Sequence, residues 1–148
     1  MFVSCLKNKD CITIGYSEID ENQRSIFELY QKIDFFGIII ANAGVGGDDN
    51  ILSGNPSEIN KILKINFLGV INSVIPFIPT MKRQHSGKIA IISSIAAFRG
   101  IPGHGAYSSS KAALQNITES WDYTLKPYGN QEYIPADDCL IIPTLNIS

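Results

Sequence analysis

The sequence predicts an α/β domain built around a parallel sheet, and two observations lead to that class. Isoleucine occurs 25 times in the 148 residues, and many copies stand in short, unbroken apolar runs. Such runs are typical of strands buried on both faces of a parallel sheet. The segments between the runs show helical periodicity, and alternating strands and helices with short connections favour a sheet covered by helices. Residues 1–148 are predicted to form a single domain.

Three apolar runs are predicted as strands. Phe36 to Ala41 and Lys88 to Ile92 are the strongest, because each ends in residues that form turns. Asn-Ala-Gly follows the first run, and two serines follow the second. Cys11 to Tyr16 is a weaker third candidate. We expect helices to separate these strands along the chain.

Two helices are predicted before the last of these strands. Asp20 to Ile33 places apolar side chains on one face and begins with acidic residues, which the helix dipole favours at that end. The second helix runs from Pro56 to about Ile75 and follows Asn55, which can cap it. Its apolar stripe includes one amide, Asn66. Both patterns predict helices that pack one face against the sheet.

A third helix is predicted from Tyr107 to Lys126, and Pro127 and Gly129 stop it. After Gly129 the sequence follows neither helical nor strand periodicity. We therefore expect residues 129–148 to form a poorly defined tail of the same domain. The sequence shows no internal repeat and no low-complexity segment.

The composition argues against several classes of partner. The net charge is −2 and no basic run is longer than Lys82-Arg83, so neither nucleic acid nor a membrane is an expected partner. Three cysteines without CxxC spacing and two scattered histidines predict no metal site. The first residues lack the long apolar region of a signal peptide, and no unbroken apolar stretch approaches the roughly 20 residues of a membrane helix. By elimination we expect a cytoplasmic protein.

Tyr107 and Lys111 form the pair with the clearest chemistry. They stand four residues apart at the start of a predicted helix, so the phenol and the ammonium lie on one face. A tyrosine titrates at about pH 10, and a neighbouring cation lowers its pKa by roughly 1 to 3 units. That shift favours proton exchange near neutral pH. Because such a pair arises by chance in roughly a third of chains of this composition, it needs support from other residues.

Other residues support the pair by their order along the chain. Ser94 ends a predicted strand, and open α/β sheets bind ligands at the carboxyl ends of their strands. Asn66 lies on an apolar helix stripe, and Asn42, Ala43 and Gly44 follow the other strong strand. With the segments INFLG, IISS and AYSSSKAAL, they make the chain resemble the short-chain dehydrogenase/reductase family.

The resemblance covers roughly residues 17–128 and implies a role for each matching residue. Tyr107 would be the general acid and base that exchanges a proton with the substrate oxygen, and Ser94 would hold that oxygen. Lys111 would lower the tyrosine pKa and bind the nicotinamide ribose. Asn66 would kink its helix, and its backbone carbonyl would hold a water that links Lys111 to solvent.

The same resemblance implies a cofactor, a reaction and an assembly. Asn42, Ala43 and Gly44 would line the adenosine side of the cofactor, and Gly44 would allow close approach of the backbone. The implied reaction interconverts a small-molecule alcohol and a carbonyl compound with NAD or NADP. The family pairs subunits through the helices expected at 56–75 and 107–126, so a homo-oligomer is implied.

The sequence departs from the family pattern near both ends. The family begins with a strand that runs into a Gly-x-x-x-Gly-x-Gly turn, whose backbone amides hold the pyrophosphate. Neither that motif nor the family's later Pro-Gly turn is present. We therefore expect an incomplete Rossmann-like, doubly wound parallel sheet, in which the first βαβ unit and the last strands are missing. Since Phe36 to Ala41 then loses its neighbour, we expect Cys11 to Tyr16 to move in beside it.

Three functional interpretations remain at this point. The first is an oxidoreductase that retains Asn66, Ser94, Tyr107 and Lys111 as its catalytic residues. The second is a non-catalytic, truncated remnant of such an enzyme, which is at most an interaction module, and the absent phosphate-binding turn favours it. The third is a flavodoxin-like binding domain, which only the α/β pattern supports.

Overall fold

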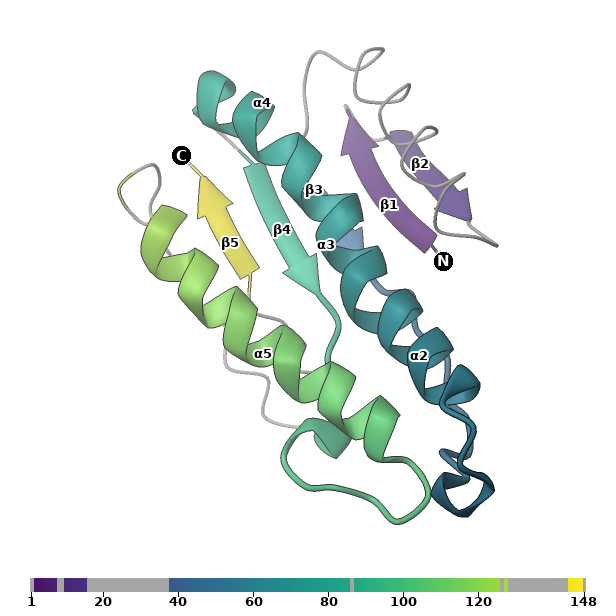
Figure 1. The fold of residues 1–148 in the computed structure, drawn as a ribbon. Coiled ribbons are helices and arrows are strands. Elements are labelled where there is room, and N and C mark those ends of the chain that lie inside the picture. Colours follow the sequence, from purple (N-terminus) through teal and green to yellow (C-terminus); the bar gives the residue numbers. More distant parts are fainter. Residues whose placement is uncertain are drawn as a thin grey trace.

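A mixed sheet forms the centre of the structure. The computed structural model describes residues 2–7, 10–15, 38–85, 87–125, 127 and 144–147. In these segments five strands form one sheet in the order β2-β1-β3-β4-β5 (Figure 1). Their bounds are Phe2–Lys7 for β1, Asp10–Gly15 for β2, Ile38–Ala41 for β3, Gly87–Ile91 for β4 and Thr144–Ile147 for β5.

The two directions of pairing divide the sheet into a centre and flanks. β3 and β4 pair in parallel, with Ile39 opposite Ile89 and Ala41 opposite Ile91. β1 pairs antiparallel with both β2 and β3, and β5 pairs antiparallel with β4. The parallel pair and the helix that connects it are the α/β unit that the sequence predicts, and this fold class is confirmed. The antiparallel flanks come from residues outside that unit.

Two of the predicted strands are confirmed as the parallel pair. Phe36 to Ala41 contains β3, with residues 36–37 outside the described range, and Lys88 to Ile92 contains most of β4. Cys11 to Tyr16 overlaps β2, but its expected place beside β3 is wrong, because β1 lies there. Only two residues separate β1 from β2 in the chain. Strands joined by so short a connection pair antiparallel with each other, which leaves the other edge of β1 for β3.

A single long helix connects β3 to β4, and its geometry changes along its length. It consists of α2 (Ser57–Leu63), a π-turn (Lys64–Leu68), α3 (Gly69–Val74), a 3-10 turn (Ile75–Phe77) and α4 (Ile78–Gln84). Asn55 Oδ1 accepts a hydrogen bond from Ser57 N at 3.0 Å. The cap position itself is occupied by Pro56, so the predicted cap and helix start are displaced by one residue. The helix continues past its expected end because Pro76 falls in the 3-10 turn, a tighter geometry that accommodates it.

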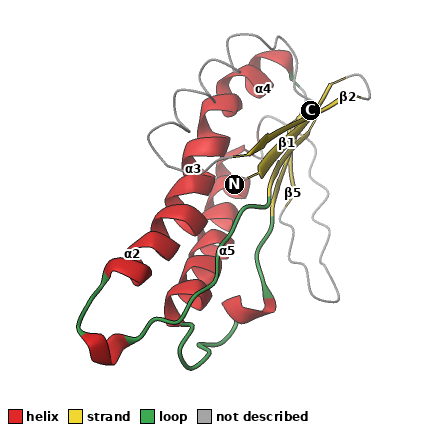
Figure 2. Ribbon diagram, turned by 90° about the vertical axis from the view of Figure 1, so that its right-hand side faces the viewer, coloured by secondary structure: helices red, strands yellow, loops and turns green. Residues whose placement is uncertain are grey.

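The second described helix, α5, spans Gly105–Leu125 and confirms the prediction for Tyr107 to Lys126. Both described helices lie on the same face of the sheet (Figure 2). The helix predicted from Asp20 to Ile33 lies outside the described residues. Of residues 129–148 the structure describes only β5, which pairs antiparallel with β4 at the edge of the sheet, so the expected tail stays a prediction.

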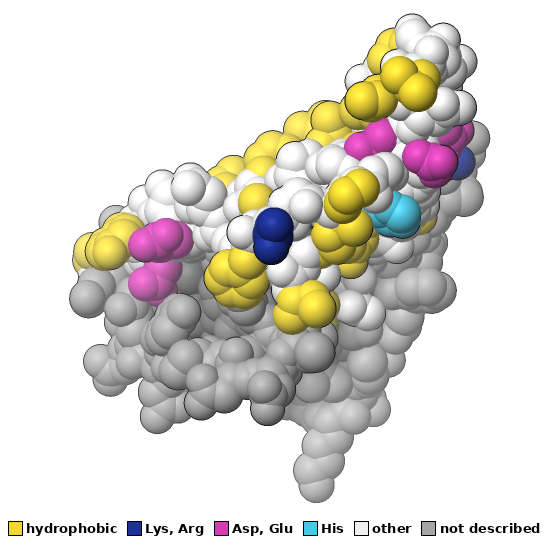
Figure 3. Space-filling model, turned by 90° about the horizontal axis from the view of Figure 1, so that it is seen from below, with side chains coloured by type: hydrophobic (Ala, Val, Ile, Leu, Met, Phe, Trp, Pro, Cys, Tyr) yellow, Lys and Arg dark blue, Asp and Glu magenta, His cyan; other side chains and the backbone are white. Residues whose placement is uncertain are grey.

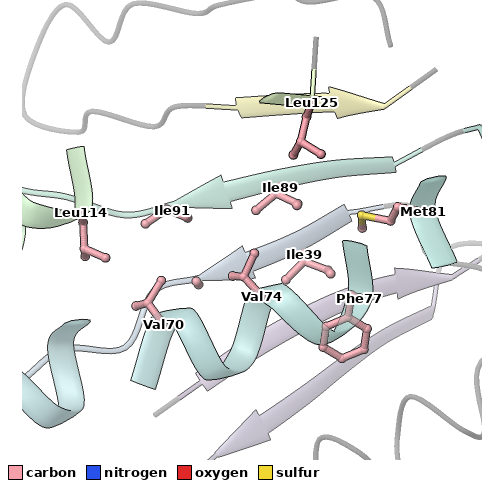
Figure 4. Close-up of a cluster of buried hydrophobic side chains, with 10 residues drawn as sticks. Ile39, Val70, Val74, Phe77, Met81, Ile89, Ile91, Leu114 and Leu125 are labelled. Carbon is pink, nitrogen blue, oxygen red and sulfur yellow. The ribbon is translucent and has the colours of Figure 1, made fainter. Parts of the chain in front are cut away.

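The core fills the space between this helical layer and the parallel strands (Figure 4). The long helix contributes Val70, Val74, Phe77 and Met81, and α5 contributes Leu114 and Leu125; the strands contribute Ile39, Ala41, Ile89 and Ile91. Burying an aliphatic or aromatic side chain of this size contributes roughly 1.5 to 3 kcal/mol, so this cluster holds the helices onto the sheet. It thereby fixes the loops at the helix ends relative to the strand ends.

The long helix also meets a length and composition test for membrane segments. Ser57–Gln84 is 28 residues long, with a mean hydropathy of 1.6 over its most apolar window. The sequence was expected to lack an unbroken apolar stretch of that length, and Asn72 and Pro76 do interrupt this helix, but they do not lower its average hydropathy enough to exclude it. Part of this helix is buried in the core, and core helices pass the same test.

Candidate active site

The candidate residues gather at the carboxyl ends of β3 and β4, at the lower end of the molecule in Figure 1. The loop after β3 carries Asn42, Ala43 and Gly44, and the loop after β4 carries Ser94 before it enters α5. Ile92 N donates to Ala41 O at 3.0 Å, so the ladder of the parallel pair continues to where the loops diverge. This edge is where open α/β sheets bind ligands.

Asn66 lies at the middle of the π-turn and ties the long helix to the loop after β3. Its side chain is fully buried. Its Oδ1 accepts from Val45 N at 2.8 Å, and its Nδ2 donates to Val45 O at 2.9 Å and to Ser110 Oγ at 3.1 Å. All of these bonds are to buried or half-buried groups, so each is costly to lose. The predicted irregularity at this position is confirmed as the π-turn.

Lys111 is a buried cation held by the end of β4. Its side chain is 3% exposed, and its Nζ donates to Ile92 O at 2.8 Å. Burial lowers the pKa of Lys111, because the low-polarity surroundings disfavour the ammonium form. The Nζ also lies 5.9 Å from the centroid of the Tyr107 ring, one helical turn away. The structure therefore brings this pair together as the spacing predicts.

Tyr107 and Ser94 border the same region from different elements. Tyr107 lies in the first turn of α5 and is half-buried. Ser94 precedes a short 3-10 turn, Ile95–Ala97, and its Oγ accepts from Ala96 N at 3.2 Å. Among the described residues, the Ser94 hydroxyl is therefore engaged in capping this turn rather than in a hydrogen bond to Tyr107.

Gly44 lies on the loop after β3, next to Val45 and close to two polar side chains of this centre. A Cβ at this position would lie 3.4 Å from Lys111 Nζ and 3.5 Å from Asn66 Oδ1. Ala43 is buried, whereas Asn42 is exposed. The glycine thus keeps the backbone in contact with both polar side chains while leaving no side chain of its own between them.

Two serines that the sequence reasoning did not single out complete the polar network. Ser110 Oγ donates to Tyr107 O at 2.7 Å and accepts from Asn66, which links α5 to the π-turn. Ser93 Oγ donates to Lys111 O at 3.0 Å and ties the end of β4 to α5. Their signal was present as the runs Ser93-Ser94 and Ser108-Ser109-Ser110, but such runs do not reveal which hydroxyl turns inward.

An open hollow of about 390 Å³ lies between the two loops, beside the start of α5. Eight residues line it: Asp48, Asp49, Asn50, Ile51, Leu52, Ile101, Gly103 and Gly105. Several large apolar side chains on these loops are exposed, Leu52 by 96% and Phe98 by 72%. Figure 3 looks onto this end and shows groups of hydrophobic side chains beside a basic one. Across the described part of the chain, no group of three His, Cys, Asp or Glu residues could hold a metal ion.

Comparison with known proteins gives a family match over most of the chain. The model of the family "short chain dehydrogenase" matches residues 11–132. An uncharacterised oxidoreductase of Myxococcus xanthus is 36% identical over 118 residues, which are 80% of this chain and 47% of that protein. Mouse 17-beta-hydroxysteroid dehydrogenase type 1 is 33% identical over 92 residues, which are 62% of this chain and 27% of that protein.

A solved structure agrees in fold. The structure of an NAD⁺-bound xylitol dehydrogenase superimposes with a TM-score of 0.64 at 25% identity, covering 74% of this chain and 42% of that one. The chain thus spans between about a quarter and a half of the length of these relatives.

Proposed function

The chain belongs to the short-chain dehydrogenase family, and from that premise we propose that it interconverts an alcohol and a carbonyl compound with NAD or NADP. The observation that carries the proposal is the placement of Lys111, which is buried, held on Ile92 O at 2.8 Å and 5.9 Å from the Tyr107 ring. A chain that merely preserved a fold would not need a desolvated cation beside a half-exposed phenol.

The proposed step is a proton exchange at the phenolic oxygen of Tyr107. In the reducing direction, Tyr107 donates its proton to the carbonyl oxygen of the substrate, which becomes the hydroxyl of the alcohol. When bound, the reduced nicotinamide supplies the hydride that adds to the carbonyl carbon. The tyrosinate that remains lies near the Lys111 ammonium, which stabilises the negative charge until the phenol is protonated again. Oxidation of an alcohol runs through the same exchange in reverse.

The residues of this centre fit the ribose end of such a cofactor. The Lys111 ammonium has three N–H donors and donates one to Ile92 O, so two remain for hydroxyl groups of a bound molecule. Gly44 leaves the space next to these donors without a side chain. Among the described residues, apart from its chain neighbours, no atom lies within 4 Å of where a Cβ of Gly46 would stand. Ala43 and Asn42 continue the same loop toward the adenosine side that we propose for them.

Ser94 is proposed to hold the substrate oxygen. Its hydroxyl lies on the loop between β4 and Tyr107, and its bond to Ala96 N is one that an incoming oxygen can share, because a hydroxyl both donates and accepts. Asn66 is proposed to serve the relay to solvent through its backbone carbonyl, which lies in the π-turn, where helical hydrogen bonds join residues five apart instead of four.

The first experiment measures cofactor binding. The purified chain is titrated with NADH and with NADPH while cofactor fluorescence is followed. We expect saturable binding in the micromolar range by wild type, weaker binding by Lys111→Met, and unchanged binding by Lys61→Met, which alters an exposed lysine. No binding at millimolar cofactor would contradict the enzyme and favour the non-catalytic remnant.

The second experiment measures turnover with two probes that differ in polarity. The exposed apolar side chains beside the hollow, Leu52 and Phe98 among them, favour an alcohol with an apolar body. The two probes are estradiol, chosen because one relative is a hydroxysteroid dehydrogenase, and xylitol, chosen because another is a xylitol dehydrogenase. We therefore expect estradiol to reduce NAD⁺ or NADP⁺ faster than xylitol does. Faster turnover of xylitol would contradict the apolar preference, and no turnover of either probe would count against the activity.

The implied homo-oligomer is also proposed for this chain. Leu68 and Ile75 on the long helix and Tyr123 on α5 are exposed by 45%, 42% and 70%. Exposed apolar side chains on both helices favour association through them. Light scattering after size-exclusion chromatography should give a mass above 16.2 kDa, and a monomeric mass at all concentrations would contradict the assembly.

A further inference from the structure

Two loops meet at one carboxylate beside the start of α5. Asp49 lies on the loop after β3 and is 8% exposed. Its backbone N–H donates to Gly103 O at 2.9 Å. Its side chain accepts from Ala106 N, at 3.1 Å through Oδ1 and at 3.0 Å through Oδ2. A single residue therefore joins the loop after β3 to the loop that enters α5, 57 positions away in the sequence.

Asp49 supplies a cap that the helix itself does not provide. Ser108 N donates to His104 O at 2.9 Å, so His104 occupies the position immediately before the helix. Its ring Nδ1 lies 3.2 Å from Pro102 O and not on a helical N–H. The free N–H groups of a first helical turn need acceptors, and a negative charge suits this end of the helix dipole. Asp49 meets both needs from another loop.

Gly105 fits the carboxylate and indicates that the contact is specific. A Cβ at this position would lie 2.8 Å from Asp49 Oδ2, closer than real Cβ atoms approach such a neighbour. Only glycine therefore lets the carboxylate reach Ala106 N past the first residue of α5. Asp49 on the loop after β3 and Gly105 at the start of α5 are thus complementary in shape.

Ala106 immediately precedes Tyr107, so whatever fixes its N–H also fixes the turn on which the phenol stands. We propose that Asp49 is a positioning residue for Tyr107: it fixes the first turn of α5 against the loop after β3 and so sets where the phenol meets the substrate. The proposal rests on the proposed function only in that Tyr107 exchanges the substrate proton. Asp49 acts through the helix and not on the substrate.

A spectroscopic experiment tests this positioning without any turnover. The full chain is labelled with 3-fluorotyrosine, and the Tyr107 signal is identified by its loss in Tyr107→Phe. We expect the ¹⁹F signal to shift or broaden in Asp49→Ala and to stay as in wild type in Asp49→Asn, whose amide oxygen still accepts from Ala106 N. Asp48→Asn, a change at an exposed neighbour, is the matched control. An unchanged Tyr107 signal in Asp49→Ala would overturn the proposal.

A double-mutant cycle tests the contact through stability. Gly105→Ala introduces a Cβ against the carboxylate of wild type, so we expect a lower midpoint of denaturant unfolding. In the Asp49→Ala background the obstacle is gone, and alanine is the better helix former, so we expect the same substitution to raise the midpoint. The same effect of Gly105→Ala in both backgrounds would overturn the assigned contact. If Asp49→Ala does not fold, Asp49→Asn replaces it in the cycle. The ¹⁹F signal of Tyr107 in Gly105→Ala then decides, because the added Cβ displaces the carboxylate and that displacement must shift the Tyr107 signal.

Kinetics separate a failure of this proposal from a failure of the proposed function. With the probe that wild type turns over, we expect Asp49→Ala to lower kcat by about tenfold and to leave cofactor affinity within about twofold, while Asp49→Asn recovers most of kcat. An Asp49→Ala enzyme with wild-type kcat would overturn the positioning role. A wild-type chain that turns over neither probe contradicts the proposed function alone, and the ¹⁹F signal then decides the position of Tyr107.

Discussion

The parallel centre of the sheet and its antiparallel flanks differ in strand direction and in whether they carry candidate site residues. β3 and β4 are covered by both described helices, and their isoleucines form the core with Val74, Phe77 and Leu114. The loops that leave these two strands carry all the candidate site residues apart from those on the helices. β1, β2 and β5 pair antiparallel and carry none of the candidate site residues. The core and the candidate site therefore share the parallel unit, so substitutions at the centre should affect both stability and the site.

The largest effect on stability is expected in the centre of the core. Ile39→Ala removes a fully buried side chain from β3, and large-to-small core substitutions of this kind cost about 2 to 5 kcal/mol. Denaturant unfolding measures the loss. Ile95→Ala, at an exposed isoleucine, is the control and should change the free energy of unfolding by less than about 0.5 kcal/mol. Equal effects of the two substitutions would contradict the assigned core.

The next effect is expected where the core meets the site. Asn66→Ala removes three hydrogen bonds and leaves Val45 N and O without these partners, so we expect a loss of about 2 to 3 kcal/mol. We also expect weaker cofactor binding, because the loop that carries Gly44 loses the side chain that holds Val45. Asn72→Ala, a half-buried amide on the same helix, should have little effect on either quantity. If Asn66→Ala keeps both the free energy of unfolding and the cofactor affinity of wild type, the Asn66 amide is not structural.

A smaller effect is expected in the flank. β1 pairs on both edges, with Ser4 opposite Thr13 on one side and Ile40 on the other. Ser4→Pro removes a backbone donor from a strand with two neighbours, and we expect a loss of about 1 to 2 kcal/mol. Ser4→Ala, which keeps the donor, is the control. If both variants unfold at the same denaturant concentration, β1 does not lie between β2 and β3.

The smallest effect is a change of stability with pH at Lys111. Burial lowers its pKa below the ordinary value of 10.5, so between the two pKa values the unfolded chain binds more protons than the folded one. Stability of wild type therefore rises with pH through that window, as the buried ammonium loses its proton. Lys111→Met should lack this rise. Parallel pH profiles of unfolding for the two proteins would contradict the burial of a charged lysine.

Local signals were sufficient to predict the central unit. The apolar runs around Ile39 and Ile89 end in turn residues, and a parallel pair with a helical crossover has few arrangements. The Tyr107 and Lys111 pair follows from spacing along a helix, which is a local property. The irregularity at Asn66 was implied only by the resemblance to the family. The roles of these residues in catalysis stay predictions.

The flanks and the positioning contacts could not be predicted in the same way. Which strand lies beside β3 depends on competition between segments, and the short connection from β1 to β2 decides it. The Asp49 contact joins residues 57 positions apart, and an aspartate on a loop has no pattern that identifies a distant partner. Ser110 likewise is one of three consecutive serines, and only the packed helix shows that it meets Asn66.

The most direct test of the account is the Tyr107→Phe variant, measured for turnover and for cofactor binding in the same preparation. Removing a general acid typically lowers the rate by about 10² to 10⁴-fold. We predict such a loss of alcohol oxidation with cofactor affinity unchanged, because the phenol oxygen is removed while Lys111 and Gly44 stay in place. Turnover at the wild-type rate in Tyr107→Phe would contradict the proposed chemistry.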